Sequence, residues 1–220
     1  SAQDSQGQVY DLVFNTDGTK MFIVSNASDS IIEYHLSTAF DVSTASYDSS
    51  LSTFGSGVTI DSAPVALAFN TDGTKMFMVG AANAKVNEYT LSTGFDISTA
   101  SYVDGFSISS DFAVYGLVFN TDGTKMFLMD AYDDDIHEYT LSTGFDVSTA
   151  SVSGSFVQTK DTSPVGLSFN PDGTKMFITG TGSNSIHEFA LTTPFSLVNI
   201  SGEHTGDVID TSSTSNKDSD

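Results

Sequence analysis

The densest group of residues capable of chemistry is an acidic cluster near the middle of the chain. It contains Asp130, Asp133, Asp134 and Asp135. Carboxylate oxygens at such spacing are typical ligands of Ca²⁺, but the loop pattern of EF-hand calcium sites is missing from this segment. We therefore interpret the cluster as a solvated acidic loop and predict no cofactor, with Ca²⁺ as the alternative.

Four glutamates recur at one position of a repeated string, and each stands two residues after an aliphatic one. They are Glu33, Glu88, Glu138 and Glu188. A lysine stands thirteen residues before each glutamate, and a hairpin between them would bring the two charges together. We predict four cross-strand ion pairs. The alternative is a ring of carboxylates around an axial metal ion, which His137 and His187 could join.

A single acid, Asp11, occurs where the other copies have Ala66, Gly116 and Gly166. It is a further weak metal candidate, and a metal-dependent hydrolase built around it is one alternative function. The chain has no His-Glu-x-x-His string, no Gly-x-Ser-x-Gly string and no phosphate-binding glycine loop. We therefore predict that the protein is not an enzyme and assign no catalytic residue.

The elements that position these residues are four copies of one unit. The string Phe-Asn-Thr-Asp-Gly-Thr-Lys-Met-Phe begins at Phe14, Phe69 and Phe119, and recurs from Phe169 with Pro171 in place of threonine. The intervals are 55, 50 and 50 residues. A repeat of this length indicates a modular fold in which each copy packs on its neighbours.

Each copy is predicted to contain four short strands. In the first, Val65, Leu67 and Phe69 alternate with small residues, which is the strand period. The Asp-Gly pair that follows predicts a tight hairpin. A Glu-Tyr strand and a more polar fourth strand complete the unit, and no segment shows a helical period. Four such units favour an all-β fold, a β-propeller with four blades of four antiparallel strands, over a β-solenoid.

The chain is accordingly divided into a short extension, 1–7, the propeller, 8–210, and a flexible polar tail, 211–220. The blades are expected at about 8–63, 64–113, 114–163 and 164–210. We expect the four blades to close into a ring within one chain, so that the protein is a monomer. A ring shared by two chains, or an open stack of molecules, is the homo-oligomeric alternative.

The string from Ser163 to Phe177, Ser-Pro-Val-Gly-Leu-Ser-Phe-Asn-Pro-Asp-Gly-Thr-Lys-Met-Phe, resembles the core motif of YVTN-type β-propeller repeats. Such repeats recur in bacterial and archaeal surface proteins, and similar ones occur in uncharacterised marine microbial and viral proteins. The resemblance covers about 8–210 and implies a propeller and an extracellular, cell-surface or virion-surface location. Members of that family usually have more than four blades.

Charge excludes several classes of partner. The chain of 220 residues has 7 Lys and no Arg against 28 Asp and Glu, a formal net charge of −21. Nucleic acids require cationic groups, so they are excluded as partners. Membrane insertion is excluded because no apolar run approaches the roughly 20 residues that span a bilayer. The chain has no Cys, which removes disulfides and thiolate metal sites.

The copies differ mainly in the loop between the second and third strands and in the connection between units. In a propeller these two sets of loops emerge on one face, and function on rigid scaffolds concentrates in variable loops. We therefore expect a non-catalytic scaffold or recognition module that binds a protein or a glycan on this face. A carbohydrate-binding module is the alternative. The candidate ligand-binding residues are Phe112, Tyr115, Tyr132, Asp133, Asp134 and Asp135.

Overall fold

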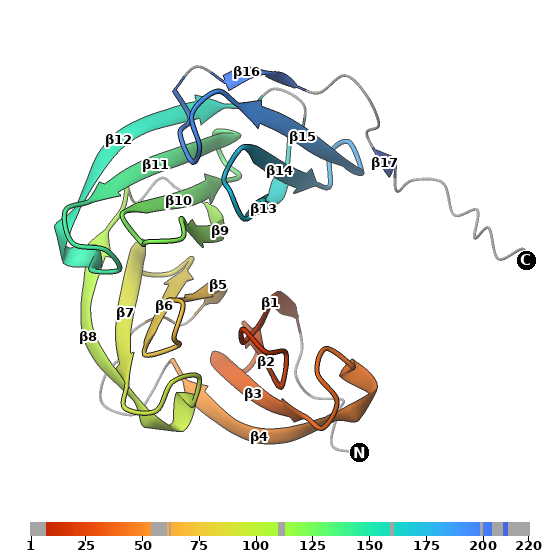
Figure 1. Ribbon diagram of the computed structural model, residues 1–220, viewed down its shortest axis with the longest axis vertical. Helices are drawn as coiled ribbons and strands as arrows, with labels where there is room; N and C mark the ends of the chain where they lie inside the picture. Colours follow the sequence, from red (N-terminus) through yellow and green to blue (C-terminus); the bar gives the residue numbers. More distant parts are fainter. Residues whose placement is uncertain are drawn as a thin grey trace, which may run out of the picture.

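The computed structural model describes residues 8–53, 61, 63–109, 113–158, 161–198, 200–203 and 209–210. These residues form a four-blade β-propeller, as the repeats predict, and Figure 1 shows the blades in chain order around a common axis. Among them there is no α-helix. None of the described segments is a helix long and apolar enough to cross a membrane.

Each of the first two blades is an antiparallel sheet whose strands pair in sequence order from the axis outward. The first comprises β1 (Val9–Phe14), β2 (Lys20–Ser25), β3 (Ser30–Leu36) and β4 (Ala45–Ser52). The second comprises β5 (Pro64–Phe69), β6 (Lys75–Gly80), β7 (Lys85–Leu91) and β8 (Ala100–Ser107). The outermost strands are polar and largely exposed, because no layer covers them.

The third and fourth blades repeat this order, and the fourth ends differently. The third comprises β9 (Val114–Phe119), β10 (Lys125–Asp130), β11 (Asp135–Leu141) and β12 (Ala150–Val157). The fourth comprises β13 (Pro164–Phe169), β14 (Lys175–Gly180), β15 (Ser185–Leu191) and β16 (Ile200–Glu203). A short β17 (Ile209–Asp210) pairs with β15 beside β16, so the last outer strand is split in two.

The hairpins between first and second strands are the Asp-Gly turns. Gly73 has a φ of +71°, a conformation that glycine adopts without strain. The Asp72 carboxylate accepts hydrogen bonds from the Thr74 amide and hydroxyl, at 3.0 and 2.6 Å. The ring of Phe95 lies directly over Gly73, where a Cβ atom would come within 2.3 Å of it. The turn therefore needs glycine for its backbone and for its packing.

A second set of turns precedes each of the first three outer strands. These turns contain the 3₁₀ helices η1 (Val42–Thr44), η2 (Ile97–Thr99) and η3 (Val147–Thr149). The carboxylate of Asp96 caps η2 by accepting from the Ser98 amide, and Asp41 and Asp146 do the same in their blades. The preceding Phe95 adopts a φ of +56° and donates its amide to Gly73 O at 3.0 Å. The two turns of each blade are thereby joined at one face.

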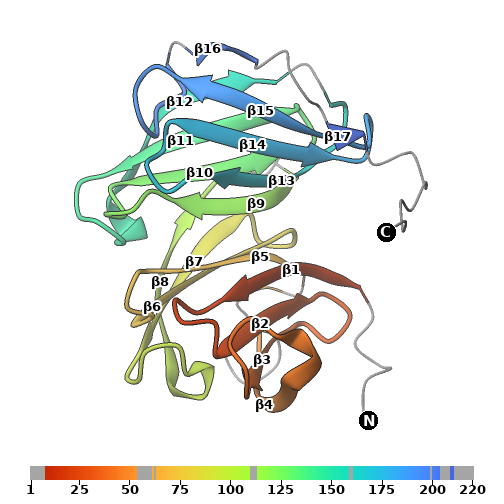
Figure 2. The ribbon, with the colours of Figure 1, turned by 45° about the vertical axis from the view of Figure 1, so that its right-hand side comes forward.

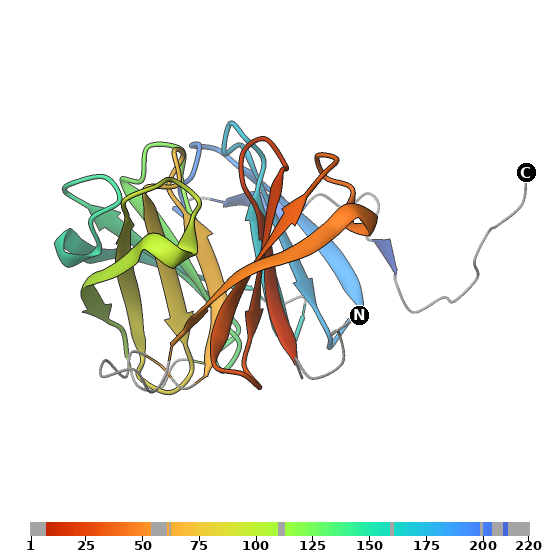
Figure 3. The ribbon, with the colours of Figure 1, turned by 90° about the horizontal axis from the view of Figure 1, so that it is seen from below.

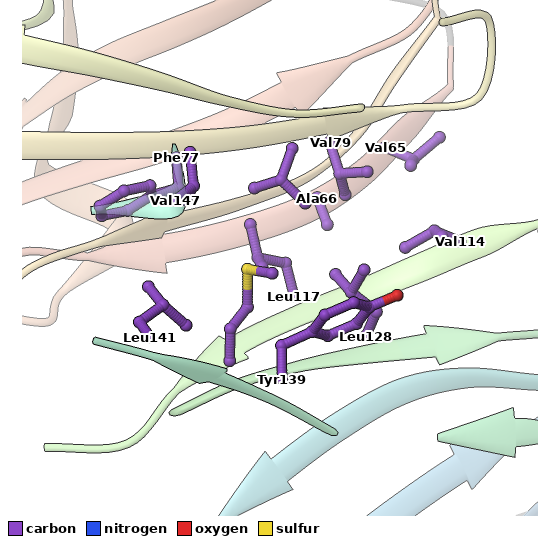
Figure 4. Close-up of a cluster of buried hydrophobic side chains, with 12 residues drawn as sticks. Val65, Ala66, Phe77, Val79, Val114, Leu117, Leu128, Tyr139, Leu141 and Val147 are labelled. Carbon is purple, nitrogen blue, oxygen red and sulfur yellow. The ribbon is translucent and has the colours of Figure 1, made fainter. Parts of the chain in front are cut away.

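The core lies between the blades. Figure 4 shows the interface of the second and third blades, where Phe77 and Val79 of β6 lie opposite Leu117, Leu128 and Tyr139. Equivalent clusters fill the interfaces of the first with the second blade and of the third with the fourth. The second strands of the two middle blades are consequently buried on both faces, which explains why their apolar residues are consecutive.

A polar clamp accompanies each of these apolar interfaces. The predicted lysine–glutamate pairs form: Lys75 Nζ lies 2.7 Å from Glu88 Oε1 within the second blade. Lys75 Nζ also donates to Phe145 O in the third blade at 2.5 Å, and Val147 N donates to Glu88 Oε2 at 3.0 Å. The same bonds join Lys20 and Glu33 to Phe95 O and Ile97 N, and Lys125 and Glu138 to Phe195 O and Leu197 N.

The ring has three such interfaces. Strand β1 packs on β5, β5 on β9 and β9 on β13, but β13 and β1 make no comparable packing among the residues that the structure describes. Figures 1 and 2 show the first and fourth blades at the two ends of the series, with their outer strands far apart. Within the described part of the chain, the expected single-chain ring therefore lacks a fourth blade-to-blade interface of the kind that joins the other blades.

The clamp generates the first testable prediction. Replacing Glu88 by alanine removes the charged acceptor of Lys75 and the acceptor of the buried Val147 amide, so Glu88→Ala should lower the free energy of unfolding by about 3–5 kcal/mol. Glu188 provides the matched control in the monomer, because it pairs with Lys175 in the fourth blade, where no turn of another described blade completes the pair. Glu188→Ala should cost at most about 1 kcal/mol. Urea unfolding of both variants measures this, and equal losses would contradict the clamp.

Candidate functional site

The loops that differ between copies gather on one face, as predicted, and we call this the variable-loop face. Backbone hydrogen bonds tie each connection between blades to the loop that follows the second strand: Ala81 N donates to Ala63 O at 2.8 Å, and Ala131 N to Ala113 O at 2.9 Å. The Asp-Gly turns and the 3₁₀ turns lie on the opposite face, and Figure 3 shows the two faces edge-on.

A pocket of about 320 Å³ lies on the axis, between the inner strands of all four blades. Tyr10, Tyr115 and Val165 are the second residues of their strands and lie at its variable-loop end, because the residues before them pair with the ends of the second strands. The full lining comprises Tyr10, Asp11, Val13, Leu67, Tyr115, Gly116, Leu117, Val165, Gly166 and Leu167.

Asp11 is the only acidic side chain among the described lining residues of this pocket. Its Oδ2 accepts from Leu67 N in the second blade at 2.8 Å, and its Oδ1 accepts from Leu12 N at 2.8 Å. Burial raises the pKa of the Asp11 carboxyl above its usual value, although both amide hydrogen bonds act in the opposite direction. A half-buried carboxyl of this kind can exchange a proton with a ligand at less acidic pH than an ordinary aspartate.

Two tyrosines flank the same pocket. The rings of Tyr10 and Tyr115 stack across the axis, with centroids 6.2 Å apart and planes inclined by 30°. The Tyr10 hydroxyl donates to Gln8 Oε1 at 3.1 Å. Tyr115, a predicted ligand residue, is thus brought to Asp11, although the two are far apart in the sequence.

A second hollow, of about 360 Å³, lies at the other end of the axis. Its polar side chains come from Thr16, Asn70, Thr71, Asn120 and Thr121, and phenylalanines form much of the rest. Its described lining holds no titratable side chain. Acid–base chemistry is therefore available in the pocket of Asp11 and not in this one.

The recurrent glutamates do not surround the axis. Glu33, Glu88 and Glu138 each engage both carboxylate oxygens, one with lysine and one with an amide of the next blade. No group of three or more His, Cys, Asp or Glu side chains suited to hold a metal occurs in the described part of the chain. The carboxylate-ring interpretation is therefore replaced by the clamp between blades.

The acidic loop of the third blade divides into a buried and an exposed part. Asp130 is buried at the end of β10, where its Oδ1 accepts from Ala113 N and Tyr132 N, both at 2.9 Å. His137 Nε2 lies 3.8 Å from Asp130 Oδ2. Burial raises the pKa of Asp135, and the neighbouring Asp133, Asp130 and Asp134 add to this while His137 opposes it. Asp130 thus supports its loop, whereas Tyr132 is 73% exposed.

The other predicted ligand residues are placed as follows. Asp133 is exposed, and Asp134 and Asp135 are half-buried, all on the variable-loop face beside Tyr132. Phe112 lies outside the described residues, as do 1–7 and 211–220. His187 is buried, and its Nε2 lies 3.0 Å from Ser183 Oγ, so it supports its own loop as a structural histidine.

Two buried aspartates that the sequence analysis passed over organise this face. Asp61 accepts from the amides of Ala63, Ala82 and Asn83, at 2.9, 3.2 and 3.1 Å. Asp161 repeats the arrangement with the amides of Ser163, Gly182 and Ser183. Burial would raise the pKa of Asp161, but its hydrogen bonds outweigh burial and hold that pKa below its usual value.

Recurrence between the repeats signals this role. A Cβ atom on Gly80 would come within 2.2 Å of Asp61 Cγ, so glycine is required where the aspartate enters from the connection. In the third blade Asp130 stands at the position of Gly80 and supplies the carboxylate from the strand itself. An aspartate recurs in all three connections, as Asp61, Asp111 and Asp161, and comparing the copies at this position would have revealed it.

Comparison with known proteins places the chain by its fold. No protein-family model matches the sequence, and no curated protein matches it either. A proposed 6-phosphogluconolactonase from Bacteroides uniformis superposes with a TM-score of 0.60 at 12% identity, over 87% of this chain and 55% of that chain. The periplasmic gluconolactonase PpgL of Pseudomonas aeruginosa gives 0.59 at 16% identity, over 92% and 52%.

The fold is also shared with proteins of other names. The Cps50 (Swd1) β-propeller domain of Myceliophteria thermophila gives a TM-score of 0.55 at 10% identity, over 86% of this chain and 53% of that chain. At these identities the likeness shows the fold alone. The chain spans about half the length of the solved structures that it matches.

These comparisons correct the prediction that the protein is not an enzyme. Two of the similar structures are named as lactonases, so the fold accommodates hydrolases. The prediction relied on the lack of contiguous catalytic strings. A propeller brings residues together at its axis from separate blades, as Asp11 and Tyr115 show, so a site can form there without such a string. The chain is therefore a β-propeller whose distant structural neighbours include lactonases.

The buried aspartates generate a stability prediction. Asp61→Ala removes the acceptor of three amides and should lower the free energy of unfolding by about 3 kcal/mol. Asp48→Ala, at an exposed position on β4, is the control and should change it by less than about 0.5 kcal/mol. The double variant Asp61→Ala, Gly80→Asp places a carboxylate where Asp130 supplies one in the third blade and should recover part of the loss. Thermal unfolding compares the variants, and equal effects of Asp61→Ala and Asp48→Ala would refute the assigned role.

Proposed function

We propose that this protein is a hydrolase of small hydroxylated lactones, which it binds in the axial pocket, and that Asp11 is its acid–base residue. The observation that supports this most directly is the position of Asp11, a half-buried carboxyl with a raised pKa in a pocket that holds no other described acid. Such a carboxyl is suited to general base catalysis.

The chemistry requires one water molecule. Asp11 takes one proton from the water molecule while the water oxygen forms a bond to the lactone carbonyl carbon. The ring C–O bond then breaks, and the departing oxygen receives the proton back from Asp11, which leaves a hydroxy acid. The stacked rings of Tyr10 and Tyr115 offer apolar faces for the C–H groups of a sugar ring.

The names of two structural neighbours support the substrate class. Both are named as lactonases, and the pocket of about 320 Å³ lies within the size range of small-molecule sites. The high negative charge of the chain favours an uncharged lactone over a phosphorylated one, since Asp11 would repel a phosphate.

Hydrolysis of glucono-δ-lactone, followed with a pH indicator above the spontaneous rate, tests the proposal. Asp11→Asn should reduce kcat/KM at least 100-fold, because general base catalysis typically supplies 10²–10⁴-fold. Asp48→Asn, at an exposed position outside the pocket, should have no effect. The wild-type rate should fall on acidification as Asp11 is protonated, with a midpoint above the ordinary value of 3.8.

Two outcomes would contradict this prediction. Wild-type protein with no activity above background would exclude hydrolysis of this lactone. Activity retained by a folded Asp11→Asn variant would exclude Asp11 as the base, and circular dichroism establishes whether that variant is folded. This check is needed because Asp11 also links β1 to β5.

A second candidate function is recognition of a glycan or protein on the variable-loop face, in a surface setting. One observation favours it: Tyr132 is 73% exposed beside Asp133. Exposed tyrosines with polar neighbours are typical of binding surfaces.

Tyrosine substitutions on a glycan array test this candidate. Tyr132→Ala should weaken any glycan bound by the wild type about tenfold or more, as expected for an aromatic residue at the centre of an interface. Tyr47→Ala is the matched control, because Tyr47 is 63% exposed on the outer strand β4. Equal binding by both variants would remove the variable-loop face from consideration.

A further inference from the structure

The clamp between blades leaves one unused half at each end of the series. A complete clamp needs a lysine–glutamate pair from one blade and a turn from the next. Four blades supply four pairs and four turns, but only three clamps form. The fourth pair and the first turn therefore have no counterpart within the described chain.

The fourth blade presents the unused pair. Lys175 Nζ lies 2.6 Å from Glu188 Oε1, but these side chains are 47% and 27% exposed, whereas Lys75 and Glu88 are 28% and 4% exposed. Phe177 and Ile186 are partly exposed beside them, although the equivalent Phe77 and Val86 are fully buried.

The first blade presents the unused turn. Val42 is 59% exposed, whereas the equivalent Ile97 and Val147 of the next two blades are fully buried. Phe40 is also 59% exposed, whereas the equivalent Phe95 and Phe145 are half-buried. Leu12 on β1 is 48% exposed, although Leu67, its equivalent on β5, is buried against the first blade. This end therefore carries the groups that the other three turns use to dock on the preceding blade.

We propose that a second copy of this chain docks its first blade on the fourth blade of the first copy, and that the contact repeats the interface between consecutive blades. In it, Lys175 Nζ donates to Phe40 O of the second copy, and Val42 N of that copy donates to Glu188 Oε2. Phe40 and Val42 cover the partly exposed Phe177 and Ile186.

Two observations favour a second copy as the occupant. The interface is already present three times within the chain, so its geometry is established for these residue types. The chain spans about half the length of the propellers it matches, and two copies joined at both ends would give eight blades, within the usual range of about 4–8. The net charge of −21 opposes association at low salt, so assembly should strengthen as salt screens it.

Light scattering across a concentration series at about 0.15 and 0.5 M salt tests the proposal. A mass of about 46 kDa, twice the 23.2 kDa of one chain, is expected for a closed pair. A mass that keeps rising with concentration supports the same contact in an open series of copies. A mass of 23.2 kDa under all conditions overturns the proposal.

Two blocking variants test which surfaces meet. Val42→Lys blocks the turn, and Glu188→Lys blocks the pair, so each variant alone should be a monomer. Mixing the two leaves one intact combination, the fourth blade of the first variant with the first blade of the second, and should restore a species of about 46 kDa. Val103→Lys, at a valine 51% exposed on β8, is the control and should assemble like the wild type.

The mixture also separates misfolding from blocked assembly, because a misfolded variant would not recover on mixing. If both variants assemble like the wild type, the contact uses other surfaces and the proposal is wrong. If both variants are folded by circular dichroism and neither they nor their mixture assemble while the control does, the head-to-tail arrangement is wrong. These outcomes do not depend on lactone hydrolysis, so failure of either proposal leaves the other testable.

Discussion

The structure depends on a buried lysine–glutamate pair that is completed by the following blade. Within one blade the pair is an ordinary cross-strand contact, which contributes little to stability. The next blade adds a carbonyl oxygen to the lysine and an amide to the glutamate, and the surrounding phenylalanines exclude water. A glutamate buried in this way is costly without its partners, so each blade requires its neighbour.

The two faces of the molecule differ in how strongly the fold constrains their sequence. One face holds the Asp-Gly turns, the phenylalanines with positive φ and the clamps, and there every copy must be nearly the same. On the variable-loop face, buried aspartates hold the loops by their backbone amides, which leaves the side chains of those loops free to differ. The axial pocket extends from that second face. Asp11 occurs in one copy alone, and the tyrosine before it recurs in the third copy as Tyr115, whereas the second and fourth copies have valine there.

Much of the fold could be predicted because the periodicity of each strand and the Asp-Gly hairpins are local signals. The pairing of Lys75 with Glu88 followed from the hairpin alone. Its contact with Phe145 could not be predicted, because the way one sheet stacks on the next is not contained in a local pattern. The role of Asp61 was missed because the residues around it in the connection vary between copies, although the aspartate itself recurs as Asp111 and Asp161. The meeting of Asp11 with Tyr115 depends on the whole arrangement of blades around the axis.

The phenylalanines with positive φ limit which substitutions the turns can accept. Phe95 adopts a backbone conformation that a bulky residue enters only at a cost, and Gly73 beneath it tolerates no side chain. Phe95 and Gly73 fit together only as a pair, so a single substitution at either position should disturb the turn. The same pair of residues occurs in all four blades. Copies of this unit should therefore diverge in their loops before they diverge in their turns. A whole unit can be duplicated or lost, because every unit carries the same groups for the interface with its neighbours.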